Sequence, residues 1–84
     1  MVTVKLFGTL RLDSGVKEFQ CEAGRVSDVY VPLHKKICET RPDSGITLPF
    51  LRACLVAVNG VRSTSTARLK SGDEVFLFTA VGGG

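Results

Sequence analysis

One stretch with helical spacing, flanked on both sides by strand-like runs, limits most strongly how this chain can fold. Val26, Val29, Leu33 and Ile37 recur at intervals of three and four residues, which places them on one face of a helix. The flanking runs are alternating or continuously apolar, as strands are. Because one helix can cover one face of a sheet, the sequence predicts an α+β fold with a mixed four- to five-stranded sheet packed on one main helix.

Turn residues divide the flanking runs into five expected strands. Val2, Val4 and Leu6 alternate with polar or outward-facing residues, which is typical of a half-buried strand. The dipeptide Asn59-Gly60 predicts a hairpin with a type I′ turn, in which both residues have positive φ. Asp13-Ser14-Gly15 predicts another hairpin, between the first two strands. The expected strands cover residues 2–7, 16–21, 53–58, 61–63 and 74–79.

Pro32 leaves two starting points open for the helix. Inside a helix a proline costs about 3 kcal/mol, whereas at the first position it is harmless. The helix therefore starts near Pro32, or its first turn is irregular, with Ser27-Asp28 as capping groups near the start. Turn-forming residues at positions 40–45 end the helix. Residues 46–52, which Pro49 interrupts, are expected to form a loop that covers one end of the core.

The cysteines and the histidine do not form a metal-binding pattern. Cys21, Cys38 and Cys54 are widely spaced, and His34 is the only histidine. A zinc site needs about four converging ligands, and a plant-type iron–sulfur centre needs a fourth cysteine. We therefore expect no metal, and reduced thiols that fill core gaps or lie at the surface. His34 is expected on the exposed side of the helix, with no catalytic role.

The formal charge of +3 and the pI of about 9.0 raise the question of nucleic-acid binding. The Lys and Arg residues are scattered, with only Lys35-Lys36 adjacent, and no aromatic RNA-binding motif occurs. We interpret them as solvated charge that can steer the protein to an acidic partner, and expect no nucleic acid. No apolar run approaches the ~20 residues of a membrane helix, and no secretory signal is recognisable. We expect a cytoplasmic protein that does not enter a membrane.

Three runs in the second half of the sequence resemble the ubiquitin-like sulfur carriers of the MoaD/ThiS family. They are Val56–Gly60, Leu69–Val75, and Phe78 through Val81 to the terminal Gly83-Gly84. The strongest resemblance is to the small subunit of molybdopterin synthase, followed by the sulfur carrier of the thiamine pathway. That subunit typically has Phe-Pro-Pro-Val where this chain has Phe78-Thr79-Ala80-Val81. The ending is similar to carriers that feed cysteine synthesis or other thiolations, so the acceptor pathway stays open.

The resemblance implies a β-grasp domain over residues 1–80 and a flexible Gly-rich tail over residues 81–84. It implies that an E1-like adenylyltransferase uses ATP and Mg²⁺ to adenylate the carboxylate of Gly84. Sulfur from a desulfurase or rhodanese then displaces AMP and leaves a thiocarboxylate. That group enters the large subunit of a synthase, or another acceptor enzyme, and donates its sulfur. The chain would bind no cofactor itself and would be a non-catalytic sulfur-donor subunit, first of all in molybdenum cofactor biosynthesis.

The tail residues Val81, Gly82, Gly83 and Gly84 suit passage into a narrow active site. Glycine has no Cβ, so its backbone fits where other residues clash. Four residues reach at most ~14 Å, at about 3.3–3.6 Å each. Ordering them costs roughly 4–8 kcal/mol, which contacts of the folded domain must offset.

Strand alternation predicts a hydrophobic docking patch beside this tail. It places Val75 and Leu77 on one face of the last strand and Phe76 and Phe78 on the other, while Phe7 lies opposite the core residues of the first strand. Three exposed Phe rings would contribute roughly 4.5–9 kcal/mol on burial, which matches the cost of ordering the tail. Phe7, Phe76 and Phe78 are therefore the predicted partner-binding residues.

Two other classes of function remain open at this point. The chain could be a covalent modifier, in which Gly84 forms an isopeptide bond to a lysine after the same adenylation. It could also be a non-catalytic β-grasp binding module, whose tail has no role. Modified lysines would identify the first, and salt-sensitive RNA binding by a tail-less chain would identify the second.

Overall fold

A mixed five-stranded sheet forms the centre of the protein in a computed structural model that describes residues 1–79. The sheet order is β2-β1-β5-β3-β4. The middle strands β1 and β5 are parallel, whereas each of the other neighbouring pairs is antiparallel. The strands are β1 (Val2–Leu6), β2 (Glu18–Cys21), β3 (Leu55–Val58), β4 (Val61–Ser63) and β5 (Glu74–Phe78).

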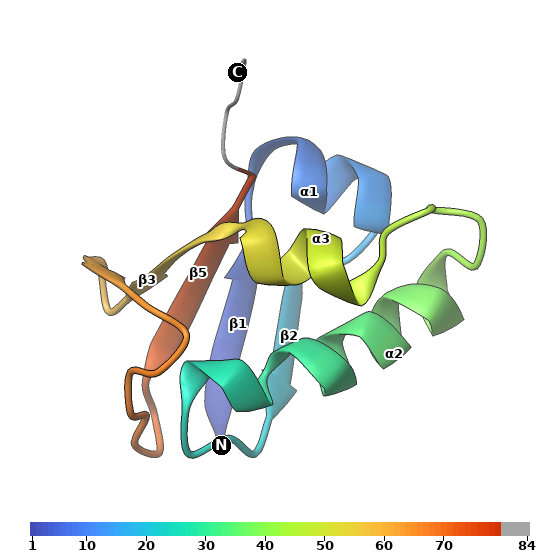
Figure 1. Cartoon of the computed structure of the whole chain (residues 1–84). Coiled ribbons are helices and arrows are strands. Elements are labelled where there is room, and N and C mark those ends of the chain that lie inside the picture. Colours follow the sequence, from blue (N-terminus) through green and yellow to red (C-terminus); the bar gives the residue numbers. More distant parts are fainter. Residues whose placement is uncertain (80–84) are drawn as a thin grey trace.

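The helices α2 (Tyr30–Thr40) and α3 (Leu48–Ala53) cover the same face of this sheet (Figure 1). On that face, alternate residues of the central strands are buried, as their sequence pattern predicts. The buried side chains of α2 and α3 complete the core on this face of the sheet. The side chains with almost no exposed surface include Val4, Leu6, Leu33, Ile37, Leu51, Val75 and Leu77. None of the helices in residues 1–79 has the length and apolar character that crossing a bilayer requires.

The main helix begins with an irregular first turn. This is the second of the two arrangements that the sequence allowed around Pro32. A 3₁₀ turn, Val26–Asp28, precedes α2, and Asp28 accepts a hydrogen bond from the backbone N–H of Arg25 at 3.1 Å. Pro32 is the third residue of α2. The first N–H groups of a helix have no partner within it, so a proline there removes no hydrogen bond. Pro32 is therefore tolerated at this position of α2.

The hairpin predicted at Asp13-Ser14-Gly15 is wrong, because a short helix, α1 (Gly8–Ser14), connects β1 to β2. Leu10 and Ser14 lie one turn apart and are both buried. The Ser14 hydroxyl accepts a hydrogen bond from the N–H of Val16 at 3.0 Å, and Gly15 ends the helix at φ 73°. The two strands remain antiparallel neighbours, so the pairing is as predicted and only the connection differs.

The loop predicted over residues 46–52 is also wrong, since most of it forms α3. The Thr47 hydroxyl caps this helix by accepting a hydrogen bond from the N–H of Phe50 at 3.3 Å. Pro49, which suggested a loop, lies in the first turn, where a proline is favourable. Leu51 is fully buried, so the helix covers one end of the core, as the predicted loop was expected to do.

The predicted turn at Asn59-Gly60 is confirmed, with φ values of 52° and 85°. Side chains also tie this turn to the one before β5. The Asn59 amide donates to Asp73 Oδ1 at 3.1 Å, and the N–H of Lys70 donates to Asp73 Oδ2 at 2.8 Å. Both hydrogen bonds stabilise the ionised carboxylate and lower the pKa of Asp73 below its usual value, and the bond from the Lys70 N–H has the larger effect. The two turns thus hold the same end of β3 and β5 together.

Replacing Gly15 by alanine is expected to destabilise the fold by more than ~1–2 kcal/mol, which is the usual cost of placing a residue with a Cβ in the left-handed backbone conformation. An added Cβ would lie 3.3 Å from Arg41 Nε and 3.4 Å from Thr40 Cγ2. Moving the Arg41 side chain away would disturb the hydrogen bond that its Nη1 donates to the carbonyl of Leu12 at 2.9 Å. Urea unfolding measures the change in free energy.

Gly45→Ala is the matched control for Gly15→Ala. Gly45 has a similar φ of 77°, but an added Cβ there would meet nothing within 4 Å. The excess loss of stability in Gly15→Ala therefore reports the contact with Arg41. Equal losses in the two variants would show that this contact contributes nothing.

Candidate functional site

Three phenylalanine rings form a cluster on the sheet face opposite α2 and α3. The β1–β5 register pairs Lys5 with Phe76, and alternation along β5 brings Phe78 to the same face. Phe7 directly follows β1, and its N–H donates to the carbonyl of Leu77 at 3.1 Å, which holds its ring beside β5. The ring centre of Phe7 lies 5.6 Å from that of Phe76 and 6.2 Å from that of Phe78, and both pairs are tilted. We call these three residues the aromatic cluster.

The aromatic cluster lies outside the core. Phe7 is 41% exposed, and Phe76 and Phe78 are half-buried, whereas Val75 and Leu77, which alternate with them along β5, are fully buried. The structure thus brings the three predicted partner-binding residues together on one open face. Large apolar side chains gathered on an open face are typical of a binding surface. Their role in docking stays a prediction.

The other predicted site residues, Val81, Gly82, Gly83 and Gly84, lie outside the described residues, as does the expected domain boundary after residue 80. The last described residue, Thr79, follows β5, and its hydroxyl lies 3.3 Å from that of Thr9 in α1. Residue 79 is therefore held at the end of the sheet where β1 and β5 both finish (Figure 1). The aromatic cluster lies at this same end.

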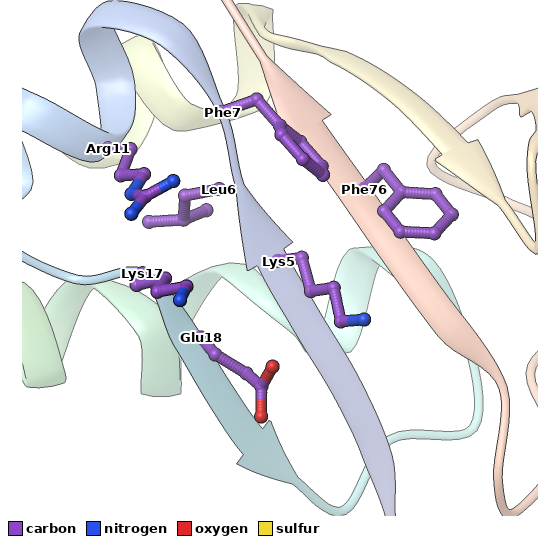
Figure 2. A pocket seen from close by; sticks show the side chains of 7 residues that line it. All are labelled: Lys5, Leu6, Phe7, Arg11, Lys17, Glu18 and Phe76. Atoms are coloured by element: carbon purple, nitrogen blue, oxygen red, sulfur yellow. The ribbon is translucent and has the colours of Figure 1, made fainter.

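A groove of about 380 Å³ adjoins the aromatic cluster. Figure 2 shows its lining, with Arg11 and Lys17 on one side of β1 and the two rings of Phe7 and Phe76 on the other. Lys5, Leu6 and Glu18 complete the lining. The Lys5 ammonium lies 3.0 Å from the Glu74 carboxylate, so it already has an ionic partner.

Sequence reasoning missed this groove because Arg11 and Lys17 were interpreted only as scattered surface charge. They meet there because α1 folds back beside the end of β1, and the sequence was not expected to form a helix at α1. The predicted antiparallel pairing of the first two strands was the one sequence signal for this groove. It brings Glu18 opposite Lys5, and both residues line the groove.

A smaller apolar notch of about 200 Å³ lies on the α3 side of the same end of β5. Phe50, Ala53, Cys54 and Thr79 line it. Phe50 is 44% exposed there, so this notch also presents a phenylalanine ring to solvent. The ring belongs to the helical face and not to the aromatic cluster.

The three cysteines are free thiols, as predicted, and two of them are buried. Burial raises the pKa of Cys21 and of Cys54, which keeps both thiols protonated and poorly nucleophilic. Cys38 is exposed, and its sulfur lies 3.7 Å from Nε2 of His34. Within residues 1–79, no three His, Cys, Asp or Glu side chains converge as metal ligands would.

The prediction that His34 is exposed is wrong. Its ring is half-buried, and Nε2 lies 3.1 Å from the carbonyl oxygen of Ile46. That contact places the segment before α3 against α2, so the histidine is covered by a part of the chain that follows the helix. His34 thus joins two elements of the fold and takes no part in the open face.

The sheet order, the parallel central pair and the long helix across one face define the β-grasp architecture of ubiquitin-like proteins. The sequence model of the ThiS family matches residues 4–84, so the chain belongs to the ThiS family, a group of ubiquitin-like sulfur carriers and protein modifiers. This assignment confirms the resemblance and the fold class that the sequence predicted.

Solved structures agree with this family. The small archaeal modifier protein 1 of Methanosarcina acetivorans is 26% identical, with a TM-score of 0.73, and the match covers 99% of this chain and 95% of that protein. A putative molybdopterin converting factor subunit 1 of Pyrococcus furiosus is 28% identical, with a TM-score of 0.68 and coverages of 95% and 97%. The modifier protein 1 of Haloferax volcanii is 26% identical, with a TM-score of 0.67 and coverages of 99% and 98%. No curated protein matches this sequence significantly.

Proposed function

We propose that this chain carries sulfur as a thiocarboxylate on its C-terminal residue, Gly84. The observation that carries the proposal is the family match, which extends through Gly84 itself. The fold supports it, because β5 finishes beside the aromatic cluster, at the end of the sheet from which the chain continues toward Gly84. An enzyme that binds this face would therefore have the chain terminus within reach.

The chemistry requires a partner, because a carboxylate is a poor electrophile. We propose that an E1-like adenylyltransferase joins an oxygen of the Gly84 carboxylate to the α-phosphate of ATP, with Mg²⁺ and with release of pyrophosphate. The terminal sulfur of a persulfide on a desulfurase or rhodanese then attacks the adenylate and displaces AMP, and a thiol reduces the resulting acyl disulfide to release the thiocarboxylate. The resulting thiocarboxylate donates sulfur in the active site of an acceptor enzyme. The chain contributes the reacting end and the surface that positions it.

The aromatic cluster is proposed to offset part of the cost of ordering the tail. Fixing four residues costs roughly 4–8 kcal/mol. Burial of a fully exposed Phe ring contributes about 1.5–3 kcal/mol, so three such rings would contribute roughly 4.5–9 kcal/mol. The three rings of the aromatic cluster are already partly covered, so their contribution to binding is smaller than this sum. Other contacts on the same face must supply the remainder, and the adjoining groove is the nearest place for them.

Molybdopterin synthesis is the pathway we propose first. It is supported by the protein from Pyrococcus furiosus, whose name describes subunit 1 of a molybdopterin converting factor. By analogy, the partner here would be the large subunit of a synthase. Carriers for thiamine, cysteine or other thiolations remain the alternatives, since residues 78–81 lack the two prolines typical of the molybdopterin subunit.

A second function, covalent protein modification, is favoured by a separate observation. Two of the similar structures are named small archaeal modifier protein 1, and each is 26% identical to this chain over nearly its whole length. A modifier would use the same adenylate and then form an isopeptide bond between Gly84 and a lysine. The two functions therefore share the first step and diverge at the acceptor.

Intact-mass analysis distinguishes these functions. The full chain is incubated with ATP, Mg²⁺, its activating enzyme and a sulfur donor, and the mass is expected to increase by the difference between one sulfur and one oxygen atom. Fragmentation should place the change on Gly84, and omission of ATP should prevent it. A chain that gains no sulfur but becomes linked through Gly84 to lysines would be a modifier. An unchanged mass with no linkage would contradict both.

A further inference from the structure

The groove beside the aromatic cluster contains two cations without an ionic partner. Lys5 is paired with Glu74 at 3.0 Å, but within residues 1–79 neither Arg11 nor Lys17 forms an ion pair. Both side chains are exposed. Counting Glu18 and the Lys5–Glu74 pair, the groove carries one net positive charge. An approaching anion would thus meet two uncommitted cations.

The chemistry of the groove changes across β1. The cationic side chains of Arg11 and Lys17 lie on one side of this strand, and the rings of Phe7 and Phe76 lie on the other (Figure 2). A ligand that fits both halves has an acidic group beside an apolar one. A surface carboxylate flanked by an aliphatic or aromatic side chain has this character, and so does the interface of many protein partners.

We propose that this groove binds an acidic side chain of the enzyme that activates the tail, with an apolar neighbour of that side chain packed on Phe7 and Phe76. The inference rests on the proposed function, because it assumes that such an enzyme exists. The choice of partner follows from position, since the groove lies at the end of the sheet where β5 finishes. Whatever acts on residues that follow Thr79 must approach this end.

Nucleic acid fits the groove less well than a carboxylate does. A backbone-binding site aligns several cations along a stripe, since each phosphate contact adds to affinity. Here two cations stand beside Glu18, whose carboxylate would repel a chain of phosphates. The two rings are tilted by 50° against each other and pack together, so neither forms a separate stacking platform.

Charge reversal at both cations tests the proposal. Arg11→Glu/Lys17→Glu in the full chain is compared with wild type in ATP–pyrophosphate exchange by the activating enzyme of the same organism. At about 0.1 M salt we expect the KM for the carrier to rise at least about tenfold, because rim charges govern encounter and register. The kcat should stay unchanged, because neither residue touches the reacting carboxylate. The defect should shrink toward 1 M salt, where the screening length falls to about 3 Å.

Lys35→Glu/Lys36→Glu is the matched control, because it changes the net charge equally on exposed positions of α2, across the sheet from the groove. It should leave the KM near the wild-type value. Arg11→Gln/Lys17→Gln, which removes charge without reversing it, should give an intermediate KM. Circular dichroism and urea unfolding verify that every variant is folded.

Three results would overturn the proposal. The groove variant could show the wild-type KM, both charge reversals could raise the KM equally, or the groove variant could lose binding to a fluorescent single-stranded RNA while still binding the enzyme. Failure of the proposed function is distinguishable, because the wild-type chain would then support no exchange. In that case calorimetric binding of the same enzyme to wild-type and variant chains still tests the groove, and equal affinities would overturn it.

Discussion

A chain that lacks Gly84, or that carries one extra residue after it, is expected to take up no sulfur while keeping its fold. One residue spans about 3.3–3.6 Å, so either change moves the terminal carboxylate by that distance from the adenylate position. A displacement of ~1 Å can already cost about 100-fold in rate, so activity should fall below detection. Intact mass after incubation with ATP, activating enzyme and sulfur donor measures the uptake.

A removable extension provides the control for this prediction. If the extra residues carry a protease site that regenerates Gly84 as the last residue, cleavage should restore sulfur uptake in the same sample. Urea unfolding of the three chains should give the same midpoint. Sulfur uptake by the shortened or uncleaved chain would show that the terminal carboxylate of Gly84 is not the carrier group.

Phe78→Asp is expected to abolish partner binding without unfolding the domain. Phe78 is half-buried on the open face, with its ring centre 6.2 Å from that of Phe7. An aspartate there would place a charge where the partner must exclude water. Truncating a central interface residue typically costs about 2–4 kcal/mol, which corresponds to roughly 30- to 1000-fold in affinity. Calorimetric titration with the activating enzyme measures this loss.

Phe50→Asp is the matched control for Phe78→Asp. Phe50 is also a large exposed ring, at 44%, but it lies on α3, across the sheet from the aromatic cluster. Its replacement by aspartate should leave partner affinity near wild type. A Phe78→Asp chain that failed to fold would instead assign the ring to the structure of the domain, and equal losses of affinity in both variants would argue against a docking face.

The strands and the Asn59-Gly60 turn could be predicted from sequence because their signals are local. Alternation along β1 and β5 separates core residues from surface residues, and a turn with two positive φ values favours one dipeptide strongly. The short helices could not be predicted in this way. Seven residues in α1 and six in α3 are too few for a periodic pattern, and their burial against the sheet, as at Leu10 and Leu51, decides their conformation.

The residues of the candidate site also divide into those that could be predicted from local sequence and those that could not. Phe76 and Phe78 could be assigned to one face from their spacing in a single strand. Arg11 and Lys17 could not, because they become neighbours only when α1 and the β1–β2 pairing bring them together. His34 was misplaced for a related reason, since the residue that covers it, Ile46, comes from a segment whose path the sequence does not specify.

The parallel pairing of β1 with β5 has a consequence for how the protein is made. It aligns Thr3 with Glu74, so the sheet cannot be completed until the last strand has joined the first. Contacts between such distant positions form late, after most of the chain has been synthesised. An unfinished or shortened polypeptide therefore has no assembled aromatic cluster to offer an activating enzyme. Under the proposed function, the order of the strands would therefore restrict ATP-dependent activation to molecules whose synthesis and folding are finished.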